Sequence, residues 1–162
     1  MTTKLTSLKG RLEITDENDE IAYVLENRNS VFAPAQWVLC RGTEEVGAFR
    51  QKLFSLAPTW FVSGSLGEFK FKQKVLSTKN SIYVEGGPLP NATVIGNFWG
   101  TQFAVLDGDR TLASAQAHMM TIRNRVSIEI LDEPELFVVF AMCIVQLVRN
   151  QETARRNVGN QS

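Results

Sequence analysis

The sequence predicts a mainly β fold, in which about twelve antiparallel strands form a closed barrel around one apolar helix. Two observations lead to this prediction. Short strand-like segments fill the chain up to residue 130 and carry a repeat whose apolar pairs are spaced 21 to 25 residues apart. Residues 134–150 then form a long apolar stretch, in which Gln146 is the only polar residue between Leu136 and Val148. A barrel of that size needs its interior filled, and this helix can fill it.

Eight segments before the helix are predicted to be strands because they are short and are β-branched, aromatic or alternating. Clusters of Gly, Asn and Asp, which favour turns, separate them. The predicted strands are residues 11–14, 22–26, 36–40, 60–62, 68–72, 81–85, 102–106 and 125–130.

A repeat runs through these segments and predicts further strands between them. Each copy ends on two apolar residues two positions apart, and a unit of this length suits a strand, a turn and a return strand. Six units therefore predict about twelve strands, whose closure removes exposed sheet edges. The alternative is an open sandwich with the helix across one face. The first apolar residue of each copy is Leu12, Trp37, Trp60, Ile82, Phe103 or Val126.

The apolar stretch carries the signals of a helix. Asp132 and Glu135 match a capping box, and Pro134 suits the first turn because its missing N–H needs no partner there. The thirteen residues from Leu136 to Val148 would span roughly 20 Å as a helix, less than the roughly 30 Å of a bilayer core, so we expect protein to enclose this helix. Residues 151–162 are polar and are predicted to be a disordered tail, which leaves residues 1–150 as a single domain.

Bulk composition narrows the class of protein. Seventeen basic and seventeen acidic residues cancel, which argues against a general nucleic-acid-binding protein or a membrane-surface polycation. Two cysteines make no disulfide framework, and the N-terminal residues lack the apolar stretch of a signal peptide. We expect a cytoplasmic monomer that has no transmembrane segment and no nucleic-acid partner.

Three motifs resemble the LURP-one-related (LOR) family. Residues 51–56, Gln-Lys-Leu-Phe-Ser-Leu, resemble its opening motif, and residues 95–103, Ile-Gly-Asn-Phe-Trp-Gly-Thr-Gln-Phe, resemble its Gly-Asn-aromatic-Trp stretch. Residues 126–132, followed by the apolar helix, resemble its C-terminal segment. The resemblance extends from about Lys4 to Asn150. Since the family is related in fold to the tubby C-terminal domain and to phospholipid scramblases, it implies a twelve-stranded barrel around a C-terminal helix.

Tubby domains bind phosphoinositide headgroups through a Lys/Arg cluster on the barrel, and this chain has a comparable pattern in residues 69–74, Phe-Lys-Phe-Lys-Gln-Lys. In a strand the three lysines share one face, where their ammonium groups could hold a phosphate. The alternative is the ordinary solvated face of a barrel strand, which lysines keep soluble. The candidate ligand-binding residues are Lys70, Lys72, Lys74, the nearby Lys79, and a second basic group of Arg50 and Lys52.

These patterns favour a non-enzymatic binding or scaffold domain that needs no cofactor. It would recognise anionic phospholipid headgroups or a protein, and it could work in the cytoplasm at the periphery of a membrane. Two alternatives stay open. One is an enzyme whose site no motif reveals, and the other is a membrane-active relative of the scramblases.

Other candidate sites have structural explanations, so no catalytic or metal-binding residue is predicted. Residues 16–20, Asp-Glu-Asn-Asp-Glu, carry oxygen ligands, but Ile21 stands where an EF-hand needs Gly and Asn27 where it needs Glu. An acidic hairpin turn is predicted instead. Three copies of the repeat have a lysine eight residues before the first apolar residue, and His118 takes that position in the last copy, which favours a structural role. Cys143 would be a poor nucleophile in an apolar helix.

Overall fold

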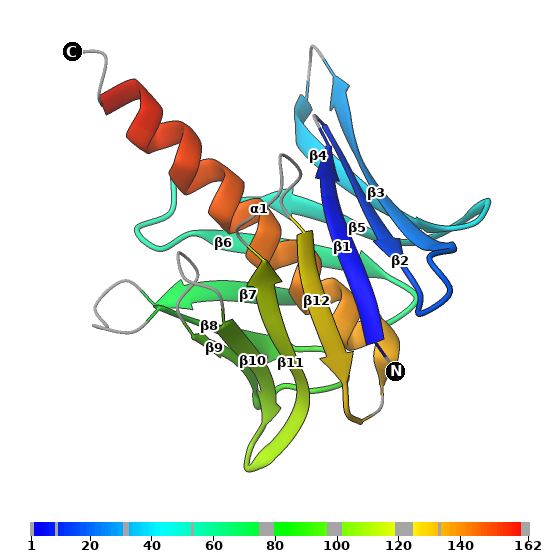
Figure 1. Cartoon of the computed structure of the whole chain (residues 1–162). Coiled ribbons are helices and arrows are strands. Elements are labelled where there is room, and N and C mark those ends of the chain that lie inside the picture. Colours follow the sequence, from blue (N-terminus) through cyan, green and yellow to red (C-terminus); the bar gives the residue numbers. More distant parts are fainter. Residues whose placement is uncertain are drawn as a thin grey trace.

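The computed structural model of the chain describes residues 2–8, 10–30, 33–52, 54–74, 80–96, 102–118, 125–132 and 134–159. Within these residues the chain forms twelve strands followed by one helix, α1 (Glu135–Gly159) (Figure 1). The strands are β1 (Thr2–Leu8), β2 (Arg11–Thr15), β3 (Ile21–Ser30), β4 (Ala33–Arg41), β5 (Glu44–Gln51), β6 (Thr59–Gly64), β7 (Phe69–Lys74), β8 (Asn80–Gly86), β9 (Ala92–Gly96), β10 (Gln102–Asp107), β11 (Arg110–His118) and β12 (Arg125–Ile130).

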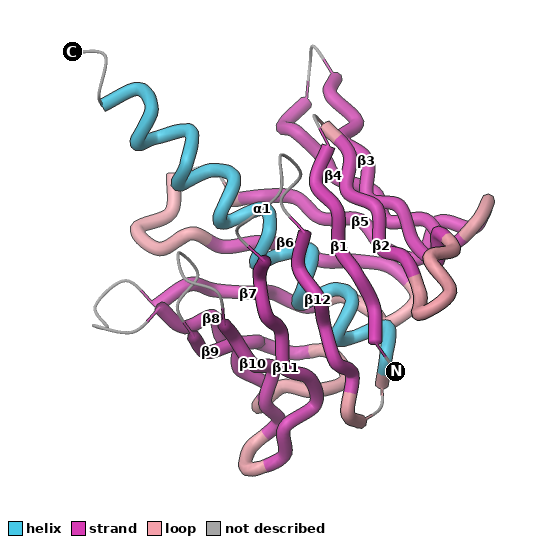
Figure 2. Tube along the Cα trace, viewed as in Figure 1, coloured by secondary structure: helices cyan, strands magenta, loops and turns pink. Residues whose placement is uncertain are grey.

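The twelve strands form one closed barrel, and α1 passes through it (Figures 1 and 2). Each strand pairs antiparallel with its neighbours in the chain, and β1 closes the ring by pairing with β12. Closure satisfies the backbone N–H and C=O groups that an open sheet would leave exposed at its edges. The predicted twelve-stranded barrel around a C-terminal helix is confirmed, and the alternative of an open sandwich is wrong.

The apolar pairs of the repeat lie on the six even-numbered strands and point into the barrel. Leu12 and Ile14 on β2 are buried, and so are the corresponding pairs on the other even-numbered strands, apart from the half-buried Trp37. Four strands, β1, β5, β9 and β11, are not among the eight predicted segments. In β11 and β5 the strand signal is weak, because β11 has alanine at alternate positions and β5 contains Gly47. Alanine and glycine are both weak strand formers. They form as the return strands that the repeat implies.

The first half of α1 fills the barrel. Every side chain from Phe137 to Val148 is buried, which matches the expectation that protein surrounds an all-apolar helix. The ring of Phe140 meets Phe49 edge-on at 5.2 Å between centroids and stacks on Phe69 at 6.1 Å. The buried Gln146 donates from Nε2 to Asn150 Oδ1 at 2.9 Å, so its amide is not left without a partner inside the apolar core.

The helix does not end at Asn150, and the prediction of a disordered tail is wrong for residues 151–159, which continue α1 to Gly159. Polar composition suggested disorder, but extending an existing helix costs far less than starting one. Contacts with the barrel also hold the extension. Gln51 and Gln151 exchange side-chain hydrogen bonds of 3.2 and 2.6 Å, and Gln73 Nε2 donates to Glu152 at 3.4 Å. Residues 160–162 lie outside the described residues.

At 25 residues α1 measures about 37 Å, and its second half projects beyond the barrel (Figure 1). Within the part of the chain that the structure describes, no helix combines the length and the apolar composition needed to cross a membrane.

Two glycines permit close contacts at β5, one with the helix and one with β6. Gly47 on β5 lies opposite Gly64 on β6, next to a register shift that turns both Val46 and Gly47 inward. A Cβ atom on Gly47 would lie 2.5 Å from Cζ of Phe140, and one on Gly64 would lie 2.3 Å from the Val46 carbonyl oxygen. Glycine at both positions therefore makes room for the ring of Phe140 and for the close β5–β6 pairing.

Candidate functional site

The lysines of β7 lie on the outer face of the barrel, as strand alternation predicts. Phe69 and Phe71 are buried against α1, whereas Lys70 and Lys72 are partly exposed and Lys74 is exposed. Cβ atoms two residues apart along a strand are about 7 Å from one another, so successive ammonium groups can reach neighbouring oxygens of one ligand. The buried phenylalanines fix this orientation, because a register slip of one residue would expose both rings.

Strand pairing brings the second basic group beside the first. Arg50 on β5 is opposite Phe61 on β6, and Phe61 is opposite Lys70 on β7. Two residue pairs further along, the backbone N–H of Lys52 donates to the Thr59 carbonyl at 2.8 Å, and Thr59 is opposite Lys72. Arg50 and Lys52 therefore face Lys70 and Lys72 across a single strand, about 10 Å away. We refer to these four residues as the basic face.

Phe61 forms the centre of the basic face. Its ring has the Arg50 guanidinium carbon at 5.8 Å from the centroid and Lys70 Nζ at 5.5 Å. These two cations come from the strands on either side of β6, so both are attracted to the electron-rich ring. The ring thus holds two positive groups close together on a surface that water can reach.

One of the four charges is already neutralised. Lys72 Nζ forms an ion pair with Glu85 Oε1 at 2.5 Å across β7 and β8. Its hydrogen bond with Glu85 raises the pKa of Lys72, and the same bond, together with the charges of Lys72 and Lys70, lowers the pKa of Glu85. Arg50, Lys52 and Lys70 have no ion pair with any residue that the structure describes, so three cations remain available to an anionic ligand.

A groove of about 740 Å³ crosses this part of the outer wall. Arg50, Phe61 and Lys70 lie in it, and Gln36 and Ser63 add uncharged hydrogen-bonding groups. The groove also contains two carboxylates, Glu85 and Glu68. Since Lys72 compensates Glu85, Glu68 is the group that opposes an anion here. The groove therefore suits a ligand that presents phosphate oxygens to Arg50 and Lys70 while keeping away from Glu68.

The remaining predicted ligand-binding residues are more peripheral. Lys74 lies at the end of β7, opposite Ser81, and does not line the groove. Lys79 lies outside the described residues. The sequence prediction overlooked Phe61 and Glu68, although the first could have been found. Buried residues at Trp60 and Val62 require the residue between them to point outward.

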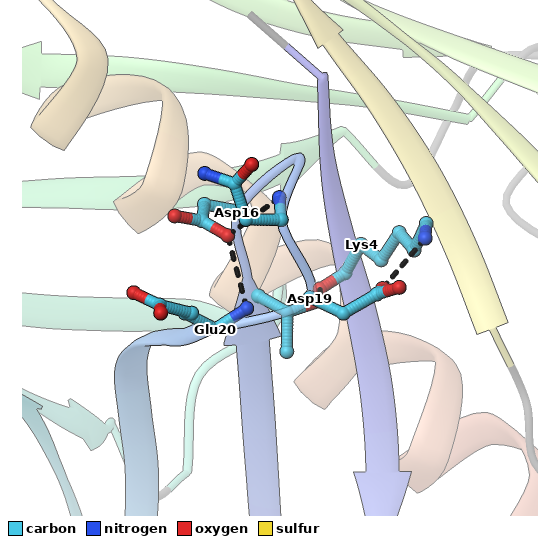
Figure 3. A network of polar contacts seen from close by, with 6 residues as sticks. Lys4, Asp16, Asp19 and Glu20 are labelled. Carbon is cyan, nitrogen blue, oxygen red and sulfur yellow. Dashed lines mark hydrogen bonds and ion pairs between the residues drawn. The ribbon is translucent and has the colours of Figure 1, made fainter.

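The acidic segment at residues 16–20 forms the turn between β2 and β3, as predicted (Figure 3). Oδ1 of Asp16 accepts hydrogen bonds from the backbone N–H groups of Asn18 at 2.8 Å and Glu20 at 3.0 Å. Asp19 forms an ion pair with Lys4 on β1 at 2.6 Å. These contacts give the carboxylates of Asp16 and Asp19 structural roles. In the described ranges, no cluster of three or more His, Cys, Asp or Glu side chains could hold a metal ion.

Two further residues that the sequence singled out lie elsewhere. Cys143 is buried in α1, and burial raises the pKa of its thiol well above the ordinary value of 9.0. It therefore carries no thiolate at neutral pH. His118 ends β11, and its side chain lies outside the described part of the structure.

Comparison with known proteins identifies the family. A search of curated proteins and a search of solved structures found no match to this chain. The sequence model of the LURP-one-related family, in contrast, matches residues 1–147, which include all twelve strands and the enclosed part of α1 up to Leu147. The chain belongs to the LURP-one-related family.

Proposed function

We propose that this protein is a non-enzymatic binding domain whose basic face recognises a phosphate-bearing anionic ligand. The observation that carries the proposal is the register of β5, β6 and β7, which aligns Arg50 with Lys70 and Lys52 with Lys72 across β6. An arginine fork and lysine ammonium groups are the donors that bind phosphate most strongly. The implied kinship with the tubby domain, which binds phosphoinositide headgroups through a Lys/Arg cluster, supports the same ligand chemistry.

The lining of the groove supports binding rather than catalysis. Its charged groups are the cations Arg50 and Lys70 and the carboxylates Glu68 and Glu85, and the latter is paired with Lys72. Ser63 is its one hydroxyl-bearing lining residue, and no hydrogen bond links Ser63 to a general base among the described residues. A binding domain of this kind would act as a monomer in the cytoplasm, at the periphery of a membrane.

Titration calorimetry with inositol 1,4,5-trisphosphate, at about 0.15 M salt, tests the proposal. A charge-assisted hydrogen bond contributes enough that Arg50→Ala and Lys70→Ala should each weaken binding about tenfold. Glu68→Gln should change the affinity in the opposite direction and tighten trisphosphate binding, because it removes the carboxylate that repels the anion. Two changes with opposite signs in one groove separate a specific site from a general loss of folding.

Lys4→Ala is the matched control. It removes the same single charge from β1, which lies across the barrel from β7. We expect it to leave trisphosphate binding unchanged. If the wild-type protein does not bind the trisphosphate, or if Lys4→Ala weakens binding as much as Lys70→Ala, the basic face is not a phosphate site. A surface for a protein partner would then be the better assignment for the groove.

A further inference from the structure

The loop between β5 and β6 exposes two large apolar side chains. Phe54 and Leu56 have relative exposures of 103% and 104%, the highest of any large apolar residue in the described structure. Single exposed apolar residues are common on protein surfaces, but here both occur within three residues on one projecting loop. Neither contributes to the apolar core, so their exposure needs another explanation.

The backbone at the base of this loop is tied to the barrel. The Lys52 N–H donates to the Thr59 carbonyl at 2.8 Å, and the Gln73 N–H of β7 donates to the Pro58 carbonyl at 2.9 Å. The Thr59 hydroxyl donates to the Ala57 carbonyl at 3.1 Å. Phe54 itself has a φ of +59°, a left-handed conformation that is uncommon for an aromatic residue. The loop is thus fixed at its base while its two apolar side chains point into solvent.

Basic residues lie at the base of the loop. Lys52 is the first residue after β5, and Lys72 on β7, which is paired with Glu85, lies opposite Thr59 on β6. The projecting part of α1 leaves the barrel at the same end, since Gln151 contacts Gln51 where β5 enters the loop, and Figure 1 shows the loop beside the helix. Arg155 and Val158 follow Gln151 by four and seven residues, so they lie on the same side of α1, and both are exposed.

We propose that this end of the barrel docks on an anionic bilayer, with Phe54 and Leu56 inserted among the lipid headgroups and acyl chains. The inference rests on the proposed function, because it names a membrane lipid as the source of the phosphate. Insertion of apolar side chains and attraction between basic residues and anionic lipids add to one another, and together they give stable peripheral binding where either alone is weak. The basic face extends from Lys52, at the base of the loop, along the outer wall to Arg50 and Lys70. These residues would bind headgroups beside those that the loop contacts.

Vesicle sedimentation tests this inference on the full chain. The vesicles are phosphatidylcholine alone and phosphatidylcholine with about 20% phosphatidylserine. The double variant Phe54→Ala/Leu56→Ala should partition into the anionic vesicles roughly tenfold more weakly than the wild-type protein, because it loses most of its insertable apolar area. Leu131→Ala is the control, since Leu131 is also exposed but lies just before α1 enters the other end of the barrel. It should bind vesicles as the wild-type protein does.

The two proposals fail separately in this design. The Phe54→Ala/Leu56→Ala variant should keep its affinity for inositol 1,4,5-trisphosphate, because neither side chain lies in the groove. If trisphosphate binding is absent but vesicle binding depends on Phe54 and Leu56, the headgroup site is wrong and insertion stands. If the double variant binds anionic vesicles as tightly as the wild-type protein, insertion is overturned whatever the trisphosphate result.

A fluorescent label gives a direct readout of insertion. Phe54→Cys in a Cys40→Ser background carries an environment-sensitive fluorophore, while the buried Cys143 stays unlabelled. Anionic vesicles should shift its emission to the blue, and brominated lipid should quench it, whereas a label at Leu131→Cys should show neither change. A label at position 54 that stays in water while the protein sediments with vesicles overturns the proposal. So does a blue shift without vesicles, which would show that the loop contacts a second copy of the chain.

Discussion

Replacing Gly47 with alanine adds a methyl group to the inner wall of the barrel, directly against the ring of Phe140. An ideally placed Cβ would lie 2.5, 3.0 and 3.1 Å from three carbon atoms of that ring. Carbon atoms in contact are best separated by about 3.5–4.0 Å, so the ring or the strand has to move by about 1 Å. The backbone of Gly47 is not in the left-handed region, and the cost is therefore steric rather than conformational.

The surroundings of Phe140 leave little room for that movement. The ring is fully buried, with Phe49 at 5.2 Å and Phe69 at 6.1 Å between centroids. Overpacking of this kind costs about 1–3 kcal/mol, a sizeable part of the roughly 5–15 kcal/mol that stabilises a typical domain. We therefore expect Gly47→Ala to lower the free energy of unfolding by about 2 kcal/mol.

Urea denaturation of four proteins measures this effect. The proteins are the wild type, Gly47→Ala, Phe140→Leu and the double variant, and Gly159→Ala serves as a control because nothing lies within 4 Å of its added Cβ. The smaller leucine makes room for the methyl group, so the double variant should lose at least about 1 kcal/mol less than the sum of the single losses. An unchanged midpoint for Gly47→Ala, or strictly additive losses, would refute the steric argument.

Two further predictions concern buried groups on and around α1. The Tyr23 hydroxyl donates to Glu135 at 3.0 Å and accepts a hydrogen bond from Arg41. Tyr23→Phe should therefore lower the free energy of unfolding, measured by urea denaturation, by about 1–2 kcal/mol. An unchanged midpoint would show that these hydrogen bonds do not stabilise the start of α1. Because burial raises the pKa of Cys143, only the unfolded chain releases this proton from about pH 9 upward, and the stability should fall as the pH rises above that value. The decline should be shallower in Cys143→Ala, and Cys143 should react with a thiol reagent only after denaturation; rapid reaction of both thiols in the native protein would contradict its burial.

The sequence was sufficient to predict which face of the six even-numbered strands is buried. Pairs such as Leu12 and Ile14, repeated six times, mark the inner wall because side chains alternate along a strand. The uninterrupted apolar stretch from Phe137 to Val145 predicted a helix surrounded by protein for a similar reason, since no side of it could face water. Both inferences depend on the local spacing of apolar residues, which can be read directly from the sequence.

Only the tertiary structure decided which outward residues meet. Lys52 and Lys72 are separated by twenty positions in the chain, and their relation through Thr59 depends on the pairing register of three strands. Register follows from turn geometry and from shifts such as the one beside Gly47, neither of which the repeat specifies. The same holds for the end of α1, where contacts from Gln51 and Gln73 support a polar segment that looked disordered.

The exposure of Phe54 and Leu56 belongs with the features that sequence alone could not give. Two apolar residues in a Lys-Leu-Phe-Ser-Leu segment are as compatible with a buried strand as with a loop. Their position follows from the hydrogen bonds of Lys52 and Pro58, which end the β5 ladder and hold the loop outside the wall. Alternation along the chain determined which residues line the inside of this barrel, because the face that a side chain takes is set by local strand geometry. Long-range strand pairing determined which residues lie side by side on the outside, because register depends on the whole fold.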